Sequence, residues 1–318
     1  MESPSISDRR PSVGRSGRRR IPGRFGPWLG VSLLVPALLL CALSCRREPR
    51  AENGARRTPR RIVALTPSIT ETLFALGLGD RVVGVGDYTY WPPEAKKKPH
   101  LGGLFNPNVE RVAALHPDLA VLMPSERDLA AKLSPLGVEA LIVPIESLAD
   151  VERSFAAIAG RCGVPEAGAR LRAEWRAGLE VAPIPGPPLK VLLSVGRDAG
   201  RLGDVTVAAP GTFLDEILVR AGGVNAFADA PTRYPQVGLE EIVARAPDLI
   251  VELRSDPLTP AASEALVREW NQLPEIAAVR AGRVVVIAAD YVLVPGPRLP
   301  LLARDLRRAL SAARAEAR

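Results

Sequence analysis

The sequence predicts an α/β protein in which two lobes, each built on a parallel β-sheet, are joined by a helical region. From residue 61 onward, short apolar runs rich in Val, Ile and Leu alternate with longer helical patterns, as in parallel sheets that helices cover on both faces. One stretch occurs twice, as "NPNVERVAALHPDLAVL" from residue 106 and as "PQVGLEEIVARAPDLIVEL" from residue 235. The two copies are too far apart for a solenoid, so they indicate two similar lobes.

The first lobe is predicted over residues 61–146 and the second over residues 187–318. Residues 147–186 between them have a helical pattern that is broken at "CGVPEAG" and closed by "PIPGPP", which predicts a bridge region. The strand candidates, in chain order, are residues 61–65, 81–85, 118–122, 139–144, 189–195, 248–253 and 283–288.

Two helices are predicted to begin in the same way in the two lobes. "PSITETLFALGLGDRVVGV" and "PGTFLDEILVRAGGVNAF" both place Ser or Thr before an apolar run, with an acidic residue expected in the first turn and glycines at the helix end. Such residues satisfy free amide groups and complement the helix dipole. Ser68 is therefore predicted to be an N-cap, with contact to a ligand as the alternative.

The composition is that of a globular protein with room for two domains, since 47% of the 318 residues are hydrophobic and 24% are charged. The formal net charge is +7, but residues 1–44 hold seven arginines against Glu2 and Asp8, a net of +5 that leaves +2 for the remaining chain. The basic character belongs mostly to this leader, so we expect no nucleic-acid partner.

The leader has an arginine-rich start followed by the apolar stretch "WLGVSLLVPALLLCALSC", which is the arrangement of a secretory signal peptide and predicts export. A transmembrane anchor ranks second, because the run contains Pro36 and is short of the roughly 20 apolar residues that a spanning helix needs. A basic signal is favoured over a twin-arginine signal at "SGRRRIPGRF".

The ending "ALSC" resembles the lipobox of bacterial lipoproteins, in which the cysteine becomes the lipidated first residue of the mature chain. Residues 1–45 are thus predicted to be a signal peptide with lipidation at Cys45. Residues 46–60 are polar and without periodicity, which predicts a flexible tether. Processing at Cys45 would leave Cys162 as the one remaining cysteine, so no intrachain disulfide is expected.

Residues for catalysis or for a metal centre are few. The chain has two histidines, His100 in a loop and His116 at a predicted helix end, which with so few cysteines predicts no protein-ligated metal and no cofactor. No dinucleotide, phosphate-loop or G-x-S-x-G motif is present in the sequence. We expect no enzyme; an enzyme that uses Ser68, Asp87 or Asp290 is the rival interpretation.

Aromatic residues gather in segments that are predicted to be loops: Tyr88, Tyr90, Trp91, Phe105, Tyr234 and Tyr291. Tyr88, Trp91 and Tyr291 follow strands, at the carboxyl edge where open α/β sheets bind ligands. Aromatics offer large, rigid contact surfaces with polar tips, so their distribution over both lobes predicts the wall of a ligand cleft.

Five segments together resemble the cobalamin and ferric-siderophore substrate-binding proteins of bacterial ABC importers, and the vitamin B12-binding proteins among them most. The segments are "RIVALTPSITETLFALGLGDRVVGVGDYTYWPPEA", "GGLFNPNVERVAALHPDLAVL", "GTFLDEILVRAGGVNAF", "YPQVGLEEIVARAPDLIV" and "ADYVLVPGPR". The resemblance runs from about residue 60 to the C-terminus. It implies two Rossmann-like lobes joined by a single long bridging helix, and a permease and ATPase complex as partners.

The resemblance also implies which residues act. Glutamates on the two lobes, here Glu110 and Glu240, would dock on arginines of the permease, although either could simply cap a helix. This chain has Leu104, Met123 and Tyr234 where vitamin B12-binding proteins have tryptophans. The residues implied to line the cleft are Pro67, Ser68, Tyr88, Trp91, Leu104, Phe105, Arg197, Tyr234, Asp290 and Tyr291.

These features together predict a periplasmic or cell-envelope lipoprotein that binds a corrinoid between its lobes and delivers it to a permease. A ferric siderophore or haem is the alternative ligand, with Tyr88 or Tyr291 as an axial oxygen ligand for haem and Arg197 as the partner of an anionic chelate. A third interpretation is a sensor or scaffold that has kept the fold without transport.

Overall fold

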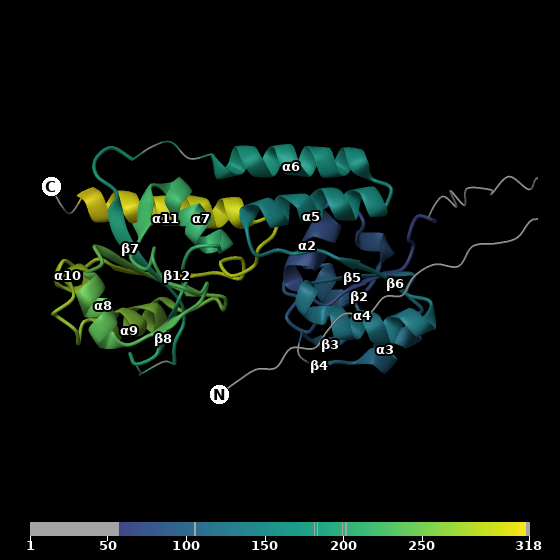
Figure 1. The fold of residues 1–318 in the computed structure, drawn as a ribbon, viewed down its shortest axis with the longest axis horizontal. Coiled ribbons are helices and arrows are strands. Elements are labelled where there is room, and N and C mark those ends of the chain that lie inside the picture. The colour runs from purple at the N-terminus through teal and green to yellow at the C-terminus, as the bar shows by residue number, and fades with distance from the viewer. Residues whose placement is uncertain are drawn as a thin grey trace, which may run out of the picture. The chain divides into compact units, whose positions relative to one another are not determined.

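The computed structural model describes residues 57–104, 106–180, 182, 184–198, 200 and 202–315, and Figure 1 shows its fold. The predicted signal peptide and Cys45, most of the predicted tether, and Phe105 lie outside the described residues. Within them, no helix combines the length and the apolar character that crossing a membrane requires.

The first lobe is built on a four-stranded parallel sheet in the order β2-β1-β5-β6. Its strands are β1 (Ile62–Ala64), β2 (Val82–Val85), β5 (Leu119–Leu122) and β6 (Glu139–Ile142). The helices of this lobe are α2 (Pro67–Ala75), α3 (Val109–Ala114) and α4 (Arg127–Leu133), and a small antiparallel pair is formed by β3 (Gly102–Gly103) and β4 (Asn106–Pro107). Strands β1 and β5 are buried along their whole length, as continuous apolar runs predict.

The second lobe is built on a six-stranded mixed sheet in the order β10-β8-β7-β11-β12, with β9 also pairing with β7. The central strands β7, β11 and β12 are parallel, whereas β8 is antiparallel to β7 and to β10. The strands are β7 (Leu189–Gly196), β8 (Val205–Val207), β9 (Gly223–Asn225), β10 (Gln236–Val237), β11 (Leu249–Arg254) and β12 (Val284–Ala288). The helices are α7 (Phe213–Ala221), α8 (Leu239–Arg245), α9 (Pro260–Trp270), α10 (Ala277–Arg280) and α11 (Leu299–Ala315).

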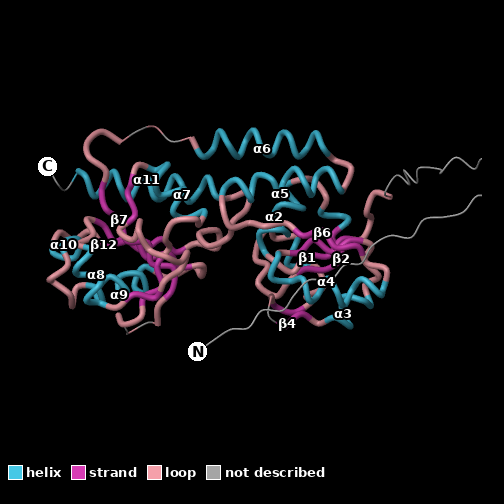
Figure 2. The backbone as a smooth tube through the Cα atoms, in the orientation of Figure 1, coloured by secondary structure: helices cyan, strands magenta, loops and turns pink. Residues whose placement is uncertain are grey.

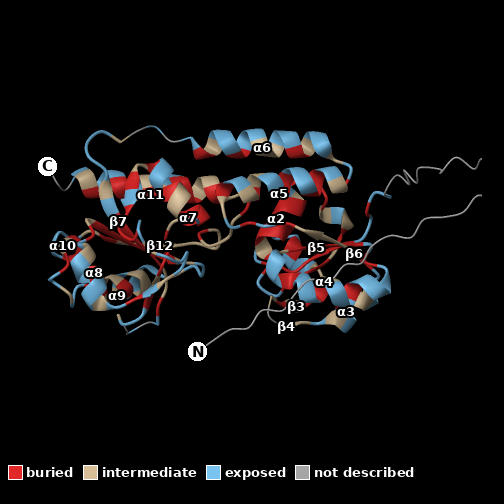
Figure 3. Cartoon of the chain, viewed as in Figure 1, coloured by how far each residue is buried: buried red, intermediate tan, exposed pale blue. Residues whose placement is uncertain are grey.

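The connection between the lobes contains two helices, α5 (Leu148–Arg161) and α6 (Pro165–Leu179), which lie side by side in Figure 2 and turn at residues 162–164. Helix α5 contributes Phe155 to the core of the second lobe and Ile158 to the core of the first. Helix α6 adds Trp175 to the second core, edge-on to the ring of Phe155 with 5.5 Å between ring centroids. Figure 3 shows that α6 exposes its outer face. The predicted two-lobed fold is confirmed, and a pair of helices spans it where one long helix was expected.

All seven predicted strands are present. The strands that the sequence did not predict are β3, β4, β8, β9 and β10, which contain only two or three residues each. Such short strands hold too few residues for a periodic pattern, and their pairing with a neighbour defines them.

The duplicated "PDL" stretch has the same role in both lobes. The carboxylate of Asp118 accepts hydrogen bonds from the backbone N–H of Arg60 at 2.8 Å and of Arg61 at 3.0 Å, and that of Asp248 accepts one from the backbone N–H of Lys190 at 2.8 Å. Each aspartate therefore fixes the start of the strand beside its own, β1 in the first lobe and β7 in the second. The repeated aspartate therefore helps to set the register between neighbouring strands in each lobe.

The chain reverses at the same place in both copies. His116 and Ala246 precede the two prolines with φ of 43° and 45°, left-handed values that are uncommon for residues with a side chain. In each copy a basic side chain covers the helix end: Arg61 Nη2 donates to the carbonyl of Leu115 at 2.7 Å, and Lys190 Nζ donates to that of Arg245 at 3.2 Å. The predicted helix-end position of His116 is confirmed.

The predicted helix starts are confirmed only in the second lobe. Thr212 caps α7 by accepting the N–H of Asp215 at 3.1 Å, with acidic residues in the first turn. In the first lobe the N-cap of α2 is Thr66, whose side chain makes no capping bond, and the first turn contains no acidic residue. The prediction of Ser68 as N-cap is wrong. Pro67 is favoured at the first helical position, so the helix begins at Pro67 and Ser68 lies inside its first turn.

Candidate functional site

A cleft of about 490 Å³ lies where loops of both lobes meet. From the first lobe it is lined by residues that follow β1 and β2, and from the second by residues that follow β11 and β12. These are the carboxyl ends of parallel strands, where open α/β sheets place their ligand sites. The lining residues are Pro67, Glu71, Tyr88, Tyr90, Trp91, Ser255, Asp256, Asp290, Leu293, Val294 and Arg298.

Three aromatic side chains from the loop after β2 stand at this cleft and remain open to solvent. The exposed fractions of Tyr88, Tyr90 and Trp91 are 65%, 47% and 44%. Large exposed aromatics that are grouped at a concave site offer stacking surface to a ligand, unlike singly scattered ones. The predicted aromatic cleft wall is thus found on the first lobe.

The loop that carries these aromatics is tied to the sheet at its base. Gly86 passes so close to β1 that a Cβ atom there would lie 1.8 Å from the carbonyl oxygen of Leu65. Asp87 donates its backbone N–H to the carbonyl of Gly102 at 3.1 Å, and its carboxylate accepts the N–H of Gly102 at 3.1 Å. Asp87, a candidate in the enzyme interpretation, therefore holds the loop and does not line the cleft.

The centre of the cleft is a group of charged side chains from both lobes. Arg298 precedes α11 and donates to Glu71 on α2 through Nη2 at 2.6 Å and Nε at 3.0 Å, and to Asp290 through Nη1 at 2.7 Å. Its guanidinium also lies over the rings of Trp91, 5.1 Å from the centroid, and Tyr291, 5.6 Å away. Burial raises the pKa of Glu71 above its ordinary value, although the bonds from Arg298 act in the opposite direction.

The backbone before Arg298 packs directly on the start of α2. A Cβ atom on Gly296 would lie 3.4 Å from the carbonyl oxygen of Ser68, and Trp175 of α6 donates its indole N–H to the carbonyl of Gly296 at 3.1 Å. This contact covers Ser68, which is 2% exposed and whose buried hydroxyl has no hydrogen-bond partner. The two lobes and the bridge thus meet behind the cleft.

A side chamber of about 400 Å³ adjoins the cleft and shares Ser255, Asp256 and Leu293 with it. Apolar side chains from β7, β11 and α9 form most of its wall, with Arg254 and Glu269 at its edge. The remaining lining residues are Val195, Leu253, Leu258, Ala262, Ala265 and Leu266. The cleft, with its charged side chains, is thus adjoined by a mostly apolar side chamber.

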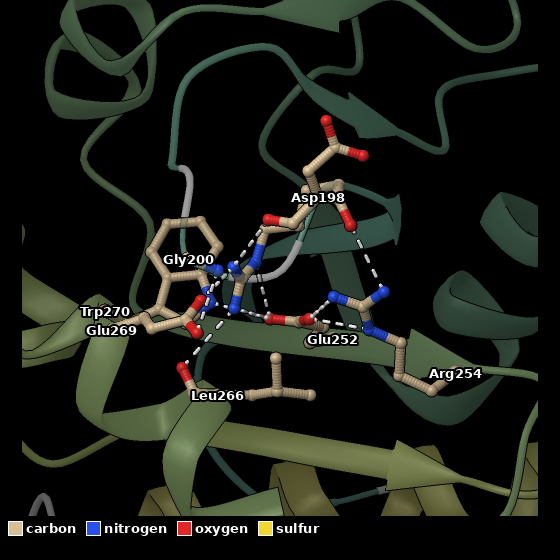
Figure 4. A network of polar contacts seen from close by, with 8 residues as sticks. Asp198, Gly200, Glu252, Arg254, Leu266, Glu269 and Trp270 are labelled. Carbon is tan, nitrogen blue, oxygen red and sulfur yellow. Dashed lines mark hydrogen bonds and ion pairs between the residues drawn. The ribbon is translucent and has the colours of Figure 1, made fainter. Parts of the chain in front are cut away.

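Arg197, predicted to line the cleft, has a fully buried side chain in the second lobe. It belongs to a network of polar contacts whose members Glu252, Glu269 and Trp270 are shown in Figure 4. It bonds Glu252 through Nε at 3.0 Å and pairs with Glu269, while Trp270 donates its indole N–H to Glu252 at 2.8 Å. Arg254 binds the other oxygen of Glu252 through Nε at 2.8 Å. Partial burial opposes ionisation of Glu269, but the Arg197 guanidinium holds its pKa below the ordinary value. The guanidinium of Arg197 is therefore already paired with two carboxylates, those of Glu252 and Glu269.

Other predicted residues also lie outside the cleft lining. The hydroxyl of Tyr291 donates to Asp305 of α11 at 2.5 Å beside a separate groove of about 550 Å³. Burial, together with that bond, raises the pKa of Tyr291 to about 12, which disfavours the phenolate that an axial oxygen ligand would supply. Tyr234 is 39% exposed in the loop before β10, and Leu104 is half-buried in the loop between β3 and β4.

Of the ten predicted cleft residues, Pro67, Tyr88, Trp91 and Asp290 meet in the cleft. Sequence reasoning missed Glu71, Ser255, Asp256, Leu293, Val294 and Arg298, and it named Tyr90 only as a loop aromatic. Arg298 ends the motif "ADYVLVPGPR", whose position after the last strand could have drawn attention to it. Glu71 carries no local signal, because a glutamate in a helix is commonplace.

Glu110 and Glu240 lie in the first turns of α3 and α8, and both are exposed. Each complements the dipole of its short helix. Among the described residues, no group of three histidine, cysteine, aspartate or glutamate side chains is arranged to hold a metal ion.

Comparisons with known proteins agree with this geometry. A sequence profile of the family described as "Periplasmic binding protein" matches residues 62–291. A cobalamin-binding protein of Halobacterium salinarum is 31% identical over 264 residues, which cover 79% of this chain and 70% of the relative. Two solved structures are similar in fold. The periplasmic vitamin B12-binding protein of Vibrio cholerae has a TM-score of 0.69 and 27% identity over 81% of this chain and 98% of that one. A periplasmic heme-binding protein of Roseiflexus sp. RS-1, in its apo form, has a TM-score of 0.68 and 29% identity over 80% of this chain and 98% of that one.

Proposed function

This chain belongs to the periplasmic binding protein family, as the sequence resemblance predicted, and from that premise we propose that it carries a corrinoid to an ABC importer. The ligand would lie in the cleft between the lobes. The single observation that carries the proposal is the cleft itself, with three exposed aromatic side chains on one wall and carboxylates and apolar groups on the other. A large flat macrocycle with an amide-bearing edge suits such a surface, because it offers faces for stacking and N–H groups for carboxylates.

The names of similar proteins support the same ligand class. The Halobacterium relative and the Vibrio structure are named for cobalamin and vitamin B12, whereas the Roseiflexus structure is named for heme. Haem and ferric siderophores therefore remain the alternative ligands. No catalytic role is proposed for the cleft, and its chemistry would be capture and release.

Fluorescence titration with cyanocobalamin tests this function. Among the described tryptophans, Trp175 and Trp270 are 4% and 0% exposed, whereas Trp91 is 44% exposed and lines the cleft. We expect saturable quenching of the purified protein by cyanocobalamin. In a calorimetric titration, which does not depend on the Trp91 signal, we expect a loss of affinity of at least tenfold in Trp91→Ala, since an aromatic anchor at a binding site is worth about 1.4 kcal/mol or more. Leu136→Ala, which removes an apolar side chain that is 55% exposed outside the cleft, is the matched control.

The result that would overturn the corrinoid proposal is the absence of saturable quenching at millimolar cyanocobalamin. Equal affinities of wild type and Trp91→Ala would instead place the ligand outside this cleft. An absorbance spectrum of the protein purified from its own cells adds an independent check, because corrinoids, haems and ferric siderophores absorb differently.

A lipid anchor at Cys45 is the second part of the proposal, and it rests on the "ALSC" sequence that closes the apolar leader. The wild-type protein is expected to incorporate labelled palmitate and the Cys45→Ala protein to incorporate none. A wild-type protein without label would refute the anchor and leave the ligand proposal intact.

A further inference from the structure

We propose that the cleft selects a large ligand without net negative charge, and that Asp256, Asp290 and Glu71 exclude polyanionic chelates. The inference rests on the proposed function, in that it takes the cleft as the ligand site. It goes further by naming the charge class of the ligand and the residues that enforce it.

The formal charge of the cleft lining is negative. Its ionisable side chains, apart from tyrosines, are Glu71, Asp256, Asp290 and Arg298, which sum to −2 with all four ionised. Protonation of Glu71 would still leave −1. An anionic ligand would therefore enter a field of its own sign, and like charges brought together at an interface weaken binding.

The one guanidinium of this lining has no free edge for an anion. Arg298 gives Nε and Nη2 to Glu71 and Nη1 to Asp290. The aromatic rings of Trp91 and Tyr291 lie near its faces. A ligand carboxylate could bind Arg298 through two hydrogen bonds only by displacing Glu71 or Asp290, which would leave the displaced charge unpaired close to the ligand.

Two arginines of the second lobe, Arg254 and Arg197, are also already paired. Arg254, at the edge of the side chamber, binds Glu252 through Nε at 2.8 Å and the carbonyl of Arg197 through Nη1 at 3.2 Å. Arg197 is buried between two glutamates. Lys96, an exposed lysine at the rim, lies 5.9 Å from the ring centroid of Tyr90. Lys96 and Asp256 are both exposed, so their charges are screened alike, and the field inside the cleft comes mainly from Glu71, Asp290 and Arg298, which sum to −1.

Neutral or cationic ligands avoid this penalty and can use the carboxylates. Ionised carboxylates only accept hydrogen bonds, so they favour ligands that present N–H donors. A carboxamide-bearing corrinoid and a cationic ferric trihydroxamate both meet this requirement. Haem, which carries two carboxylates, and a ferric tricatecholate, which is a polyanion, do not.

Calorimetric titration with four probes tests the inference on the full-length protein: cyanocobalamin, ferrioxamine B as a cationic trihydroxamate, haemin, and ferric enterobactin as a tricatecholate. We expect wild type to bind one or both of the first two and to bind the last two at least tenfold more weakly. Added salt should narrow this gap, because it screens the repulsion.

The variant Asp256→Asn/Asp290→Asn is expected to shift the ratio of affinities toward haemin or ferric enterobactin by about tenfold or more, since it removes two negative charges from the lining that an anionic ligand would face. Asparagine keeps an oxygen that can accept the bond from Arg298. Asp80→Asn removes an exposed carboxylate just before β2, at the opposite edge of the first sheet, and should leave every affinity unchanged.

The outcomes separate this inference from the proposed function. Equal binding of cyanocobalamin and ferric enterobactin would overturn the charge rule and keep the corrinoid proposal, as would an unchanged ratio in the double variant. Binding of ferrioxamine B without binding of cyanocobalamin would overturn the corrinoid proposal and keep the charge rule. Binding of none of the four probes would overturn both.

Discussion

Glu71 and Arg298 are 227 residues apart in the sequence, yet they form a two-bond ion pair that joins the lobes at the centre of the cleft. The side chain of Glu71 is 3% exposed and that of Arg298 is 15% exposed. Since the pair links α2 of the first lobe to the segment before α11 of the second, it ties the relative position of the lobes to the shape of the cleft.

This inter-lobe ion pair is expected to contribute to stability as a unit. Removing one partner of a buried pair leaves an unpaired charge and costs about 3 kcal/mol or more, so Glu71→Gln and Arg298→Met should each lower the free energy of unfolding by roughly that amount. The double variant should lose much less than the sum. Denaturation by urea measures the cycle, and strict additivity of the two changes would contradict the coupling.

Asp118 and Asp248 are each expected to stabilise their own lobe, because Asp118 accepts two backbone N–H groups and Asp248 accepts one from the start of the neighbouring strand. Asp118→Ala and Asp248→Ala should each reduce the free energy of unfolding by about 0.5–1.5 kcal/mol, the net contribution of a typical hydrogen bond, because water can reach these exposed N–H groups once the carboxylate is gone. Glu174→Gln, an exposed change on α6, serves as the control. A loss of stability in only one of the two variants would show that the two copies of the repeat do not contribute equally to stability.

Glu110 and Glu240 are expected to act in delivery and not in ligand capture. The double change Glu110→Ala/Glu240→Ala should lower uptake by cells that carry the permease, while the affinity for cyanocobalamin stays unchanged. Each change removes only a first-turn charge worth about 0.3–1 kcal/mol to its helix. Glu166→Ala is a matched control, since Glu166 is also an exposed first-turn glutamate, but on α6 of the bridge. Loss of ligand binding in the double variant would refute the docking role.

Glu126 should make stability depend on pH. Burial raises the pKa of this carboxyl, although the N–H of Met123 at 2.7 Å and the hydroxyl of Thr66 at 3.3 Å both lower it. Since the folded state binds the proton more tightly than the unfolded state, the stability contributed by the protonated carboxyl is complete below the ordinary value of 4.5 and is lost as the pH rises through the folded pKa.

Glu126→Gln keeps an oxygen that accepts the same bonds but cannot ionise. The variant should therefore gain stability relative to wild type as the pH rises from about 4 to 7, by about 1.4 kcal/mol for each unit by which folding raises the pKa. Thermal unfolding across this pH range measures the difference. If the difference in stability between Glu126→Gln and wild type is constant with pH, or decreases toward neutral pH, the raised pKa of Glu126 would be contradicted.

Strand positions were predictable because buried parallel strands leave a continuous apolar run in the sequence. The run at β5 was assigned correctly for this reason, and all its residues are buried. The start of α2 was not predicted correctly, because the side chains of Ser68 and Thr66 are both chemically suited to cap a helix. The geometry imposed by Pro67 decided between them.

The sequence by itself determined the two-lobed fold, the repeated Asp118 and Asp248, and the aromatic loop after β2, because each depends on residues that are close together in the chain. Only the tertiary structure decided which polar residues face the cleft. Arg197 and Arg298 both lie near ends of strands or helices, yet the first is enclosed by Glu252 and Glu269, and the second reaches Glu71 in the other lobe. The direction and partners of a charged side chain depend on carboxylates that lie far away in the sequence, and the folded chain alone brings them together.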